Sequence, residues 1–317
     1  MSWMNTTRWL DKSKNDLEEI CKSLLKKDGK DLVPSDKREN LSYFNVKIKL
    51  TSTDTDFPGI KGKIEYKAFE GTFERGKVKG QLENSLINFQ LVLYKVEEDI
   101  FIVINRNADA STIIRRLLGY KQKNELESSQ FKLNNSLFLW TVEKVFNDDE
   151  GELSYTTSNQ SELSLLINNV TGIKGETPQS NKLTASGNTI VKLLSTLSLL
   201  LEVNKLRQIQ VEIEMVKHEQ LFIKLQKDGV IGFEQLDYSG EFENDPQSVR
   251  STKLILLIYE TIMPIIMTEY KTDVDENIWN DKKVEKFIDD IKQLLITKVD
   301  AIKGEIDASL SGNLVEK

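Results

Sequence analysis

Glu65 and Lys67 form a Glu-x-Lys pair in the segment GKIEYKAF, residues 62–69, where apolar and polar residues alternate. In a strand, residues two apart share a face, so both side chains would project to the same side. Metal-dependent nucleases hold Mg²⁺ with such a glutamate and an upstream aspartate, while the lysine steadies the attacking water or the phosphate. Asp54 or Asp56 stands upstream in this chain. A Mg²⁺-dependent nuclease using Glu65, Lys67 and Asp56 is therefore one hypothesis.

The same spacing of an acidic residue and a lysine occurs five times in the chain. The sequence contains no second group of acidic residues that the fold would necessarily bring close to Glu65. The alternative interpretation is the solvated face of a half-buried strand. Under it we expect no catalytic residue, no bound metal and no cofactor, and Mg²⁺ belongs to the nuclease hypothesis alone.

A basic face is a broader interpretation of the same region. Cations alternate here with Tyr66, Phe69 and Phe73, a mixture that sheets use to bind nucleic acids, although several glutamates dilute the charge. The alternative is a mixed-charge edge that discourages aggregation of the sheet. The candidate nucleic-acid-binding residues are Lys61, Lys63, Lys67, Arg75, Lys77, Lys79, Arg115 and Arg116.

The sequence lacks the residues that several other kinds of catalytic site require. The chain has one histidine and one cysteine, so histidine-rich zinc sites and two-histidine mechanisms are excluded. His218 falls in an expected exposed turn, and Cys21 is expected to be a small core residue of a helix. No glycine pattern of a dinucleotide-binding or P-loop type follows an expected strand. The sequence favours binding or assembly over small-molecule catalysis.

Composition sets the outer limits. A chain of 317 residues with 39% hydrophobic and 29% charged residues is long enough for two globular domains without disulfides. The net charge is −7, and residues 201–317 carry 15 basic against 23 acidic residues, so a nucleic-acid site is expected in the first half. The first residues lack a secretory pattern, and we expect a cytoplasmic protein without a membrane segment.

Periodicity predicts the elements of the first half. An amphipathic helix over residues 7–27, capped by Thr6 or Thr7, is followed by alternating segments that are typical of strands. A helix is expected at 109–118, where Gly119 ends it. The expected strands are 43–50, 62–69, 71–80, 86–94, 100–104 and 136–146.

The second half begins with a polar stretch. Residues 151–187 are rich in Gly, Ser, Thr and Asn and indicate a linker or loop region. A helix is expected at 188–203, followed by strands at 209–216 and 221–225 and a third short strand. Residues 253–267 predict a buried helix with a kink near Pro264, and residues 276–303 a long amphipathic helix.

These patterns predict an α+β protein. An antiparallel-sheet domain with flanking helices over 1–150 precedes the linker at 151–187, and a second α+β domain over 188–317 ends in long helices. The expected function is a non-enzymatic binding or assembly subunit of a multi-component system, acting on a protein partner or a second copy through amphipathic helices. The Lys, Asn and Ile content favours a bacterial or phage source. Nucleic-acid binding and the Mg²⁺-dependent nuclease are the two alternatives.

Overall fold

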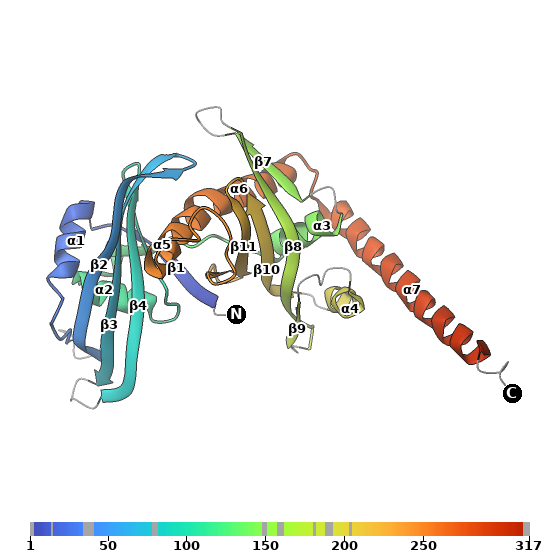
Figure 1. Cartoon of the computed structure of the whole chain (residues 1–317), viewed down its shortest axis with the longest axis horizontal. Helices are drawn as coiled ribbons and strands as arrows, with labels where there is room; N and C mark the ends of the chain where they lie inside the picture. The colour runs from blue at the N-terminus through green and yellow to red at the C-terminus, as the bar shows by residue number, and fades with distance from the viewer. Residues whose placement is uncertain are drawn as a thin grey trace.

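The computed structural model describes residues 3–13, 15–33, 41–77, 82–147, 151–156, 162–179, 182–187, 193–202 and 205–312. Within these ranges the protein is α+β, with a 12-stranded sheet in which all strand pairs are antiparallel. Helices pack on the sheet and also form the C-terminal part of the chain (Figure 1). The expected fold class is confirmed.

Strand β1 (Trp3–Asp11) joins the two halves of the sheet. Its residues 3–6 pair with one half, and its residues 7–10 pair with the other. The first half contains β2 (Leu41–Gly59), β3 (Gly62–Lys77), β4 (Leu82–Val96), β5 (Asp99–Ile104) and, paired with β1, β6 (Leu126–Ser128). The second half contains β12 (Ile231–Glu234), β11 (His218–Gln226), β10 (Lys205–Met215), β8 (Glu162–Glu176), β7 (Glu152–Thr156) and β9 (Lys182–Ser186).

Two short helices cover the outer face of the first half, on the left of Figure 1. They are α1 (Leu17–Leu25) and α2 (Ala110–Leu118). Their apolar residues pack with Phe69 and Phe73 of β3 in one core cluster. The prediction of a helix that ends at Gly119 is confirmed, because this glycine has the left-handed φ of 75° that such an end requires.

A long helical segment lies between the two halves of the sheet (Figure 1). It consists of α5 (Gln247–Leu257), the π-helical segment η2 (Ile258–Ile262) and α6 (Met263–Asp275). This segment is long and apolar enough to cross a bilayer, but 78% of its most apolar window is buried inside the protein. The predicted buried helix is confirmed, and its irregularity lies immediately before Pro264.

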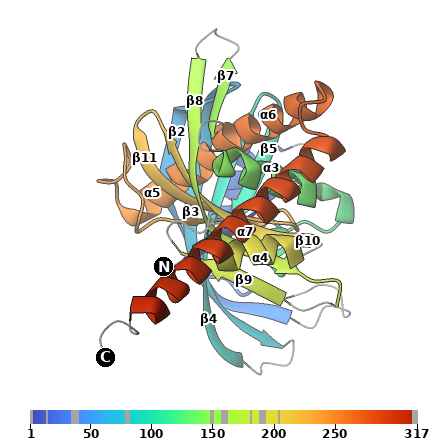
Figure 2. The same ribbon diagram turned by 90° about the vertical axis from the view of Figure 1, so that its right-hand side faces the viewer.

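Helices α3 (Asn135–Phe146) and α4 (Leu194–Glu202) lie on the side of the second half of the sheet that is turned away from the first half (Figure 1). The last helix, α7 (Asp281–Gly312), crosses α4 and α3 in Figure 2 and leaves the body of the protein in Figure 1. The expected long C-terminal helix is confirmed.

Two predicted elements have the wrong type. Residues 3–11, partly assigned to the first helix, form the central strand β1, and the helix starts at Leu17. Asp16 and Glu19 form a reciprocal capping box there, which fixes the start of α1 and separates it from β1. Residues 136–146 form α3 rather than a strand, because Asn134 caps this segment by accepting a hydrogen bond from the backbone of Leu137.

The predicted loop at 151–187 is also wrong in its secondary structure. The described part of this region forms β7, β8 and β9. Strand β8 pairs with β10 from Leu165 to Glu176, and three irregularities in the register let small and polar residues remain in the ladder. The region therefore belongs to the sheet. The division into domains that was drawn on either side of it stays a prediction.

Candidate functional site

Glu65 and Lys67 lie on one face of β3, as the alternation predicts, whereas Asp56 lies on β2. The Lys67 ammonium pairs with Glu18 of α1, with 2.5 Å between Nζ and Oε1. This hydrogen bond raises the pKa of Lys67. Asp56 pairs instead with Lys63 at 2.8 Å. Within the described ranges, no three His, Cys, Asp or Glu side chains are grouped to hold a metal ion. The contact that Lys67 makes fixes α1 to the sheet.

The predicted basic face is divided along β3. Lys61 and Lys63 lie at its start and Lys77 at its end, about 45 Å away at ~3.3 Å per residue. Arg75 pairs with Asp109, Arg115 and Arg116 lie on α2, and Lys79 lies outside the described residues. Acidic side chains thus neutralise several of these cations. Nucleic-acid binding by this set stays a prediction.

His218 is buried, against the prediction of an exposed turn. It is the first residue of β11, its side chain packs against the ring of Phe242, and its Nδ1 lies 2.7 Å from the hydroxyl of Tyr238. The hairpin turn uses only Val216 and Lys217, and Lys217 takes a left-handed φ of 70°. His218 therefore lies inside the ladder, one position beyond the turn. Burial lowers the pKa of its imidazole.

Arg8 and Glu260 form a buried ion pair between β1 and η2. Nη1 of Arg8 lies 3.0 Å from Oε1 of Glu260, and Nε donates to the backbone oxygen of Ser129 at 2.9 Å. The hydroxyl of Tyr94 donates to the same carboxylate oxygen at 2.6 Å. Burial raises the pKa of Glu260, and the positive charge of Arg8 opposes that effect. The rings that surround the guanidinium belong to Phe101, Phe131 and Tyr259.

Pro264 explains the irregular helix beside this pair. Proline has no N–H to donate to the carbonyl four residues earlier, which is that of Glu260. The Glu260 carbonyl instead accepts a hydrogen bond from Ile60 N–H, at 3.2 Å, in the turn between β2 and β3. The N–H of Met263 donates to Ile258, the five-residue spacing of a π-helix. The helical irregularity thereby binds the β2–β3 turn and holds the Glu260 side chain on Arg8.

A cavity of 790 Å³ opens beside the Arg8–Glu260 pair and includes Lys61 and Tyr270 in its lining. Sequence reasoning missed Arg8, because residues 7–27 were assigned to one helix. Glu260 was visible only as a lone charge in an apolar helix. That charge was a usable signal, since a buried carboxylate requires a partner.

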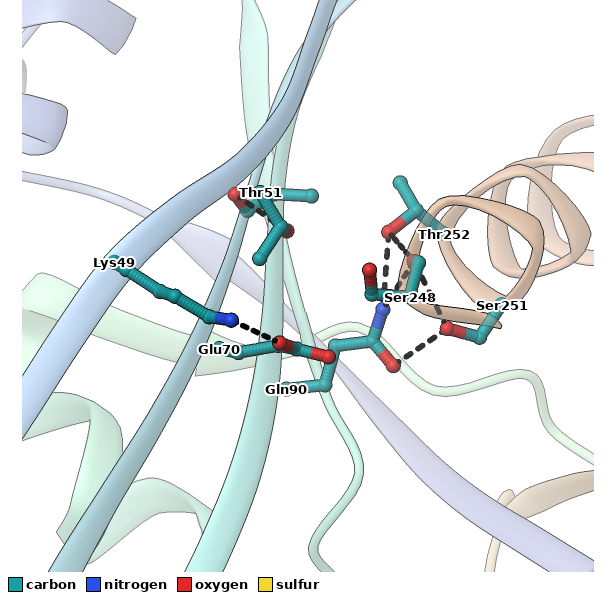
Figure 3. A network of polar contacts seen from close by, with 8 residues as sticks. Lys49, Thr51, Glu70, Gln90, Ser248, Ser251 and Thr252 are labelled. Atoms are coloured by element: carbon teal, nitrogen blue, oxygen red, sulfur yellow. Dashed lines mark hydrogen bonds and ion pairs between the residues drawn. The ribbon is translucent and has the colours of Figure 1, made fainter. Parts of the chain in front are cut away.

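Gln90 of β4 connects the sheet to α5 (Figure 3). Its amide nitrogen donates to the backbone oxygen of Ser248 and to Oγ1 of Thr252, both at 3.0 Å. The hydroxyl of Ser251 donates back to the amide oxygen at 2.8 Å. Both ends of the buried amide are therefore used. In the same view, the exposed pair Lys49 and Glu70 borders a groove of 780 Å³ over β2–β4.

The first half of α7 packs on the body. Phe287 meets Phe146 of α3 edge to face, with 5.4 Å between ring centroids, and Ile291 is fully buried. Lys283 pairs with the buried Glu143 at 2.7 Å. These contacts fix the direction in which the rest of the helix leaves the protein.

The second half of α7 keeps large apolar side chains in solvent. Their exposed fractions are 52% for Ile296, 36% for Val299, 45% for Ile302 and 50% for Ile306. We refer to residues 295–306 as the α7 arm. Exposed apolar groups that follow one side of a helix are typical of an interaction surface.

Comparison with known proteins found no family model and no curated protein that matches this chain. We therefore infer its function from the fold and the geometry of the α7 arm.

Proposed function

We propose that this protein is an assembly subunit that self-associates through the α7 arm. The observation that supports this proposal is the exposed apolar stripe on a helix that extends beyond the body (Figure 1). The body itself buries the apolar face of the first half of α7, through Phe287 and Ile291. A second copy of the arm is the occupant that we propose for the remaining stripe.

The stripe has the spacing of a coiled coil. Val299, Ile302 and Ile306 are separated by three and four residues, and Leu295, which is partly buried against the body, stands four residues before Val299. At 100° per residue they fall within about 60° of one another, which corresponds to alternating d and a positions of a heptad. Two such stripes can pack knobs into holes over about 10 Å of helix, from Val299 to Ile306.

The charges that flank the stripe favour an antiparallel pair. Lys298 and Glu305 occupy the g positions of this heptad, and Lys303 an e position. With Val299 packed on Ile302 of a second copy, Lys298 lies beside Glu305 of that copy, and the reverse pair forms by symmetry. A parallel pair would instead place Lys298 beside Lys303 of the second copy, which is repulsive.

Sedimentation velocity of the full-length protein over roughly 1–100 μM tests the proposal, because an interface this short is expected to be weak. The wild-type sedimentation coefficient should rise with concentration. A Val299→Glu/Ile302→Glu variant should remain monomeric, because it would place carboxylates in the apolar contact. Thr297→Glu adds one such carboxylate on the opposite side of the exposed helix and is the control. A wild type that stays monomeric throughout would exclude self-association.

Charge reversal tests the orientation. Lys298→Glu or Glu305→Lys alone should weaken an antiparallel dimer, and the double reversal should restore it, because the pair is re-formed with opposite signs. In a parallel dimer, Lys298→Glu would instead strengthen association, because the new glutamate would face Lys303 of the second copy. Restoration in the double variant cannot arise from misfolding, so it separates a lost contact from a damaged helix.

A further inference from the structure

A second cavity lies where β1, β12 and the start of α2 meet. Its volume is 650 Å³, within the range of about 300–1,000 Å³ that small-molecule sites occupy. It is separate from the α7 arm. Its polar lining residues are Asn5, Arg75, Asn105, Arg106, Asn107, Asp109 and Gln235.

Two arginines in this cavity share one carboxylate. Arg106 binds Asp109 through Nε at 3.1 Å and Nη2 at 2.7 Å, and Arg75 reaches the same carboxylate through Nη2 at 2.5 Å. Nε of Arg75 is buried and has no hydrogen-bond partner within the described ranges. The lining therefore carries one net positive charge and an unused guanidinium donor. The N-terminus of α2, at Ala110, adds to the positive potential.

Gln235 provides an independent sign of a missing ligand. The residue lines the cavity and is only 6% exposed, and its Oε1 is buried and has no partner among the described residues. A buried amide oxygen without a donor costs about 1–3 kcal/mol. A ligand with an N–H group would satisfy it once the side-chain amide turns its Oε1 toward the cavity. Trp3 also lines the cavity; Nζ of Lys224 lies 4.7 Å from the centroid of its ring, so a flat ligand would stack on the opposite face.

We propose that this cavity binds a nucleoside phosphate. The phosphate meets Arg75 and Arg106, which are suited to bidentate contacts with anions. An exocyclic amino group of the base donates to Oε1 of Gln235. Asp109 occupies the two arginines when the ligand is absent and competes with the phosphate when it is present.

Isothermal titration calorimetry with the full-length protein tests the proposal. The probes are AMP, CMP, GMP and UMP, the matching nucleosides and inorganic phosphate. We expect a nucleoside monophosphate to bind more tightly than its nucleoside or phosphate alone. The three bases that carry an amino group should bind better than uracil. Binding of phosphate alone with equal affinity would overturn the assignment of a nucleotide, and no binding at several millimolar would overturn the site.

Substitutions at the lining residues test which of them contact the nucleotide. Arg106→Gln should weaken nucleotide binding roughly 10- to 100-fold, whereas Arg115→Gln, on α2 and outside the cavity lining, is the matched control. Gln235→Leu should remove the preference over uracil and leave the phosphate contribution unchanged.

Asp109→Asn gives the sharpest result, because removing the competing charge should tighten binding about fivefold. A gain of affinity cannot come from unfolding, and Asp109→Ser repeats the test if the first variant folds poorly. Weaker or unchanged binding in both Asp109 variants would contradict the role of this residue.

Discussion

At the scale of single residues, His218 shows how burial changes an ionisable group. The Tyr238 hydroxyl accepts a hydrogen bond from the backbone of Phe242 and lies next to Nδ1 of His218. Burial raises the pKa of Tyr238 to about 12 and lowers that of His218. The two side chains therefore favour their neutral forms and join β11 to the segment that follows β12.

His218 should make stability depend on pH. Below its ordinary pKa of 6.5 the unfolded chain binds a proton that the folded protein does not yet bind. The free energy of unfolding should therefore fall as the pH drops from 6.5 towards the lower pKa of the folded state. The chain has no other histidine, so a His218→Gln variant lacks this contribution. Urea unfolding at pH 7.5, 6.5 and 5.5 should show the wild type losing more stability than the variant, and a parallel loss in both proteins would contradict the prediction.

The sequence predicted which side chains are buried where the hydrophobic period was clear. It did not predict which residues contact one another. The alternation of β3 placed Tyr66 and Ala68 on the buried face, and both are buried. Nothing in that pattern showed that Lys67 would pair with Glu18, because the pairing depends on how α1 returns to the sheet. The turn was expected at residues 217–220, but β11 starts three residues earlier, at His218, and this difference moves the side chain from solvent to the core.

At the scale of elements, the Arg8–Glu260 pair connects β1 to the π-helical segment. Both side chains are almost completely removed from solvent, with 12% and 10% of their areas exposed. A buried ion pair contributes little net stability, but removing one partner leaves the other charge without compensation. The stability of the protein should therefore be sensitive to replacement of either residue alone.

Arg8→Ala should lower the free energy of unfolding by about 3–5 kcal/mol, because the Glu260 carboxylate would remain buried without its cation. Arg8→Leu/Glu260→Leu should cost less than the sum of the two single changes, since the double variant leaves no unpaired charge. Urea unfolding at pH 7 measures Arg8→Ala, the double variant and its two component single variants. The exposed Lys121→Ala is a control expected within about 0.5 kcal/mol of the wild type. Simple additivity would show that the two residues do not act as a pair.

The hairpins and the C-terminal helices could be predicted from the sequence. For two other segments, the sequence did not show whether they form a helix or a strand. Strands β10 and β11 alternate over several residues and are joined by a short turn, so local pattern suffices. Residues 3–11 form a strand because β5 and β12 pair with them, and those partners lie about 100 and 230 residues away in the chain. Residues 136–146 are rich in aromatic and β-branched residues, yet the cap at Asn134 and packing in the core decide for a helix.

At the scale of the whole molecule, one core cluster contains residues from both halves of the chain. Ile64 and Tyr66 of β3 belong to the same cluster as Ile258 of η2, Ile209 of β10 and Phe287 of α7. Strand β1 adds to this connection, because it is hydrogen-bonded to both halves of the sheet. The predicted boundary near residue 150 thus separates segments that share a core and a strand.

A fragment of residues 1–150 tests whether that boundary separates independent domains. Without the rest of the chain, residues 3–6 of β1 lose their partner β12, and the apolar face around Tyr66 loses the helix that covers it. We expect the fragment to bind a hydrophobic dye and to unfold without the cooperative transition of the full-length protein. A fragment of residues 1–306, which ends beyond the contacts of α7 with the body, is the control and should keep the transition. If the 1–150 fragment unfolds cooperatively with little dye binding, its own core around α1 and α2 is sufficient, and the two halves are independent domains joined by β1.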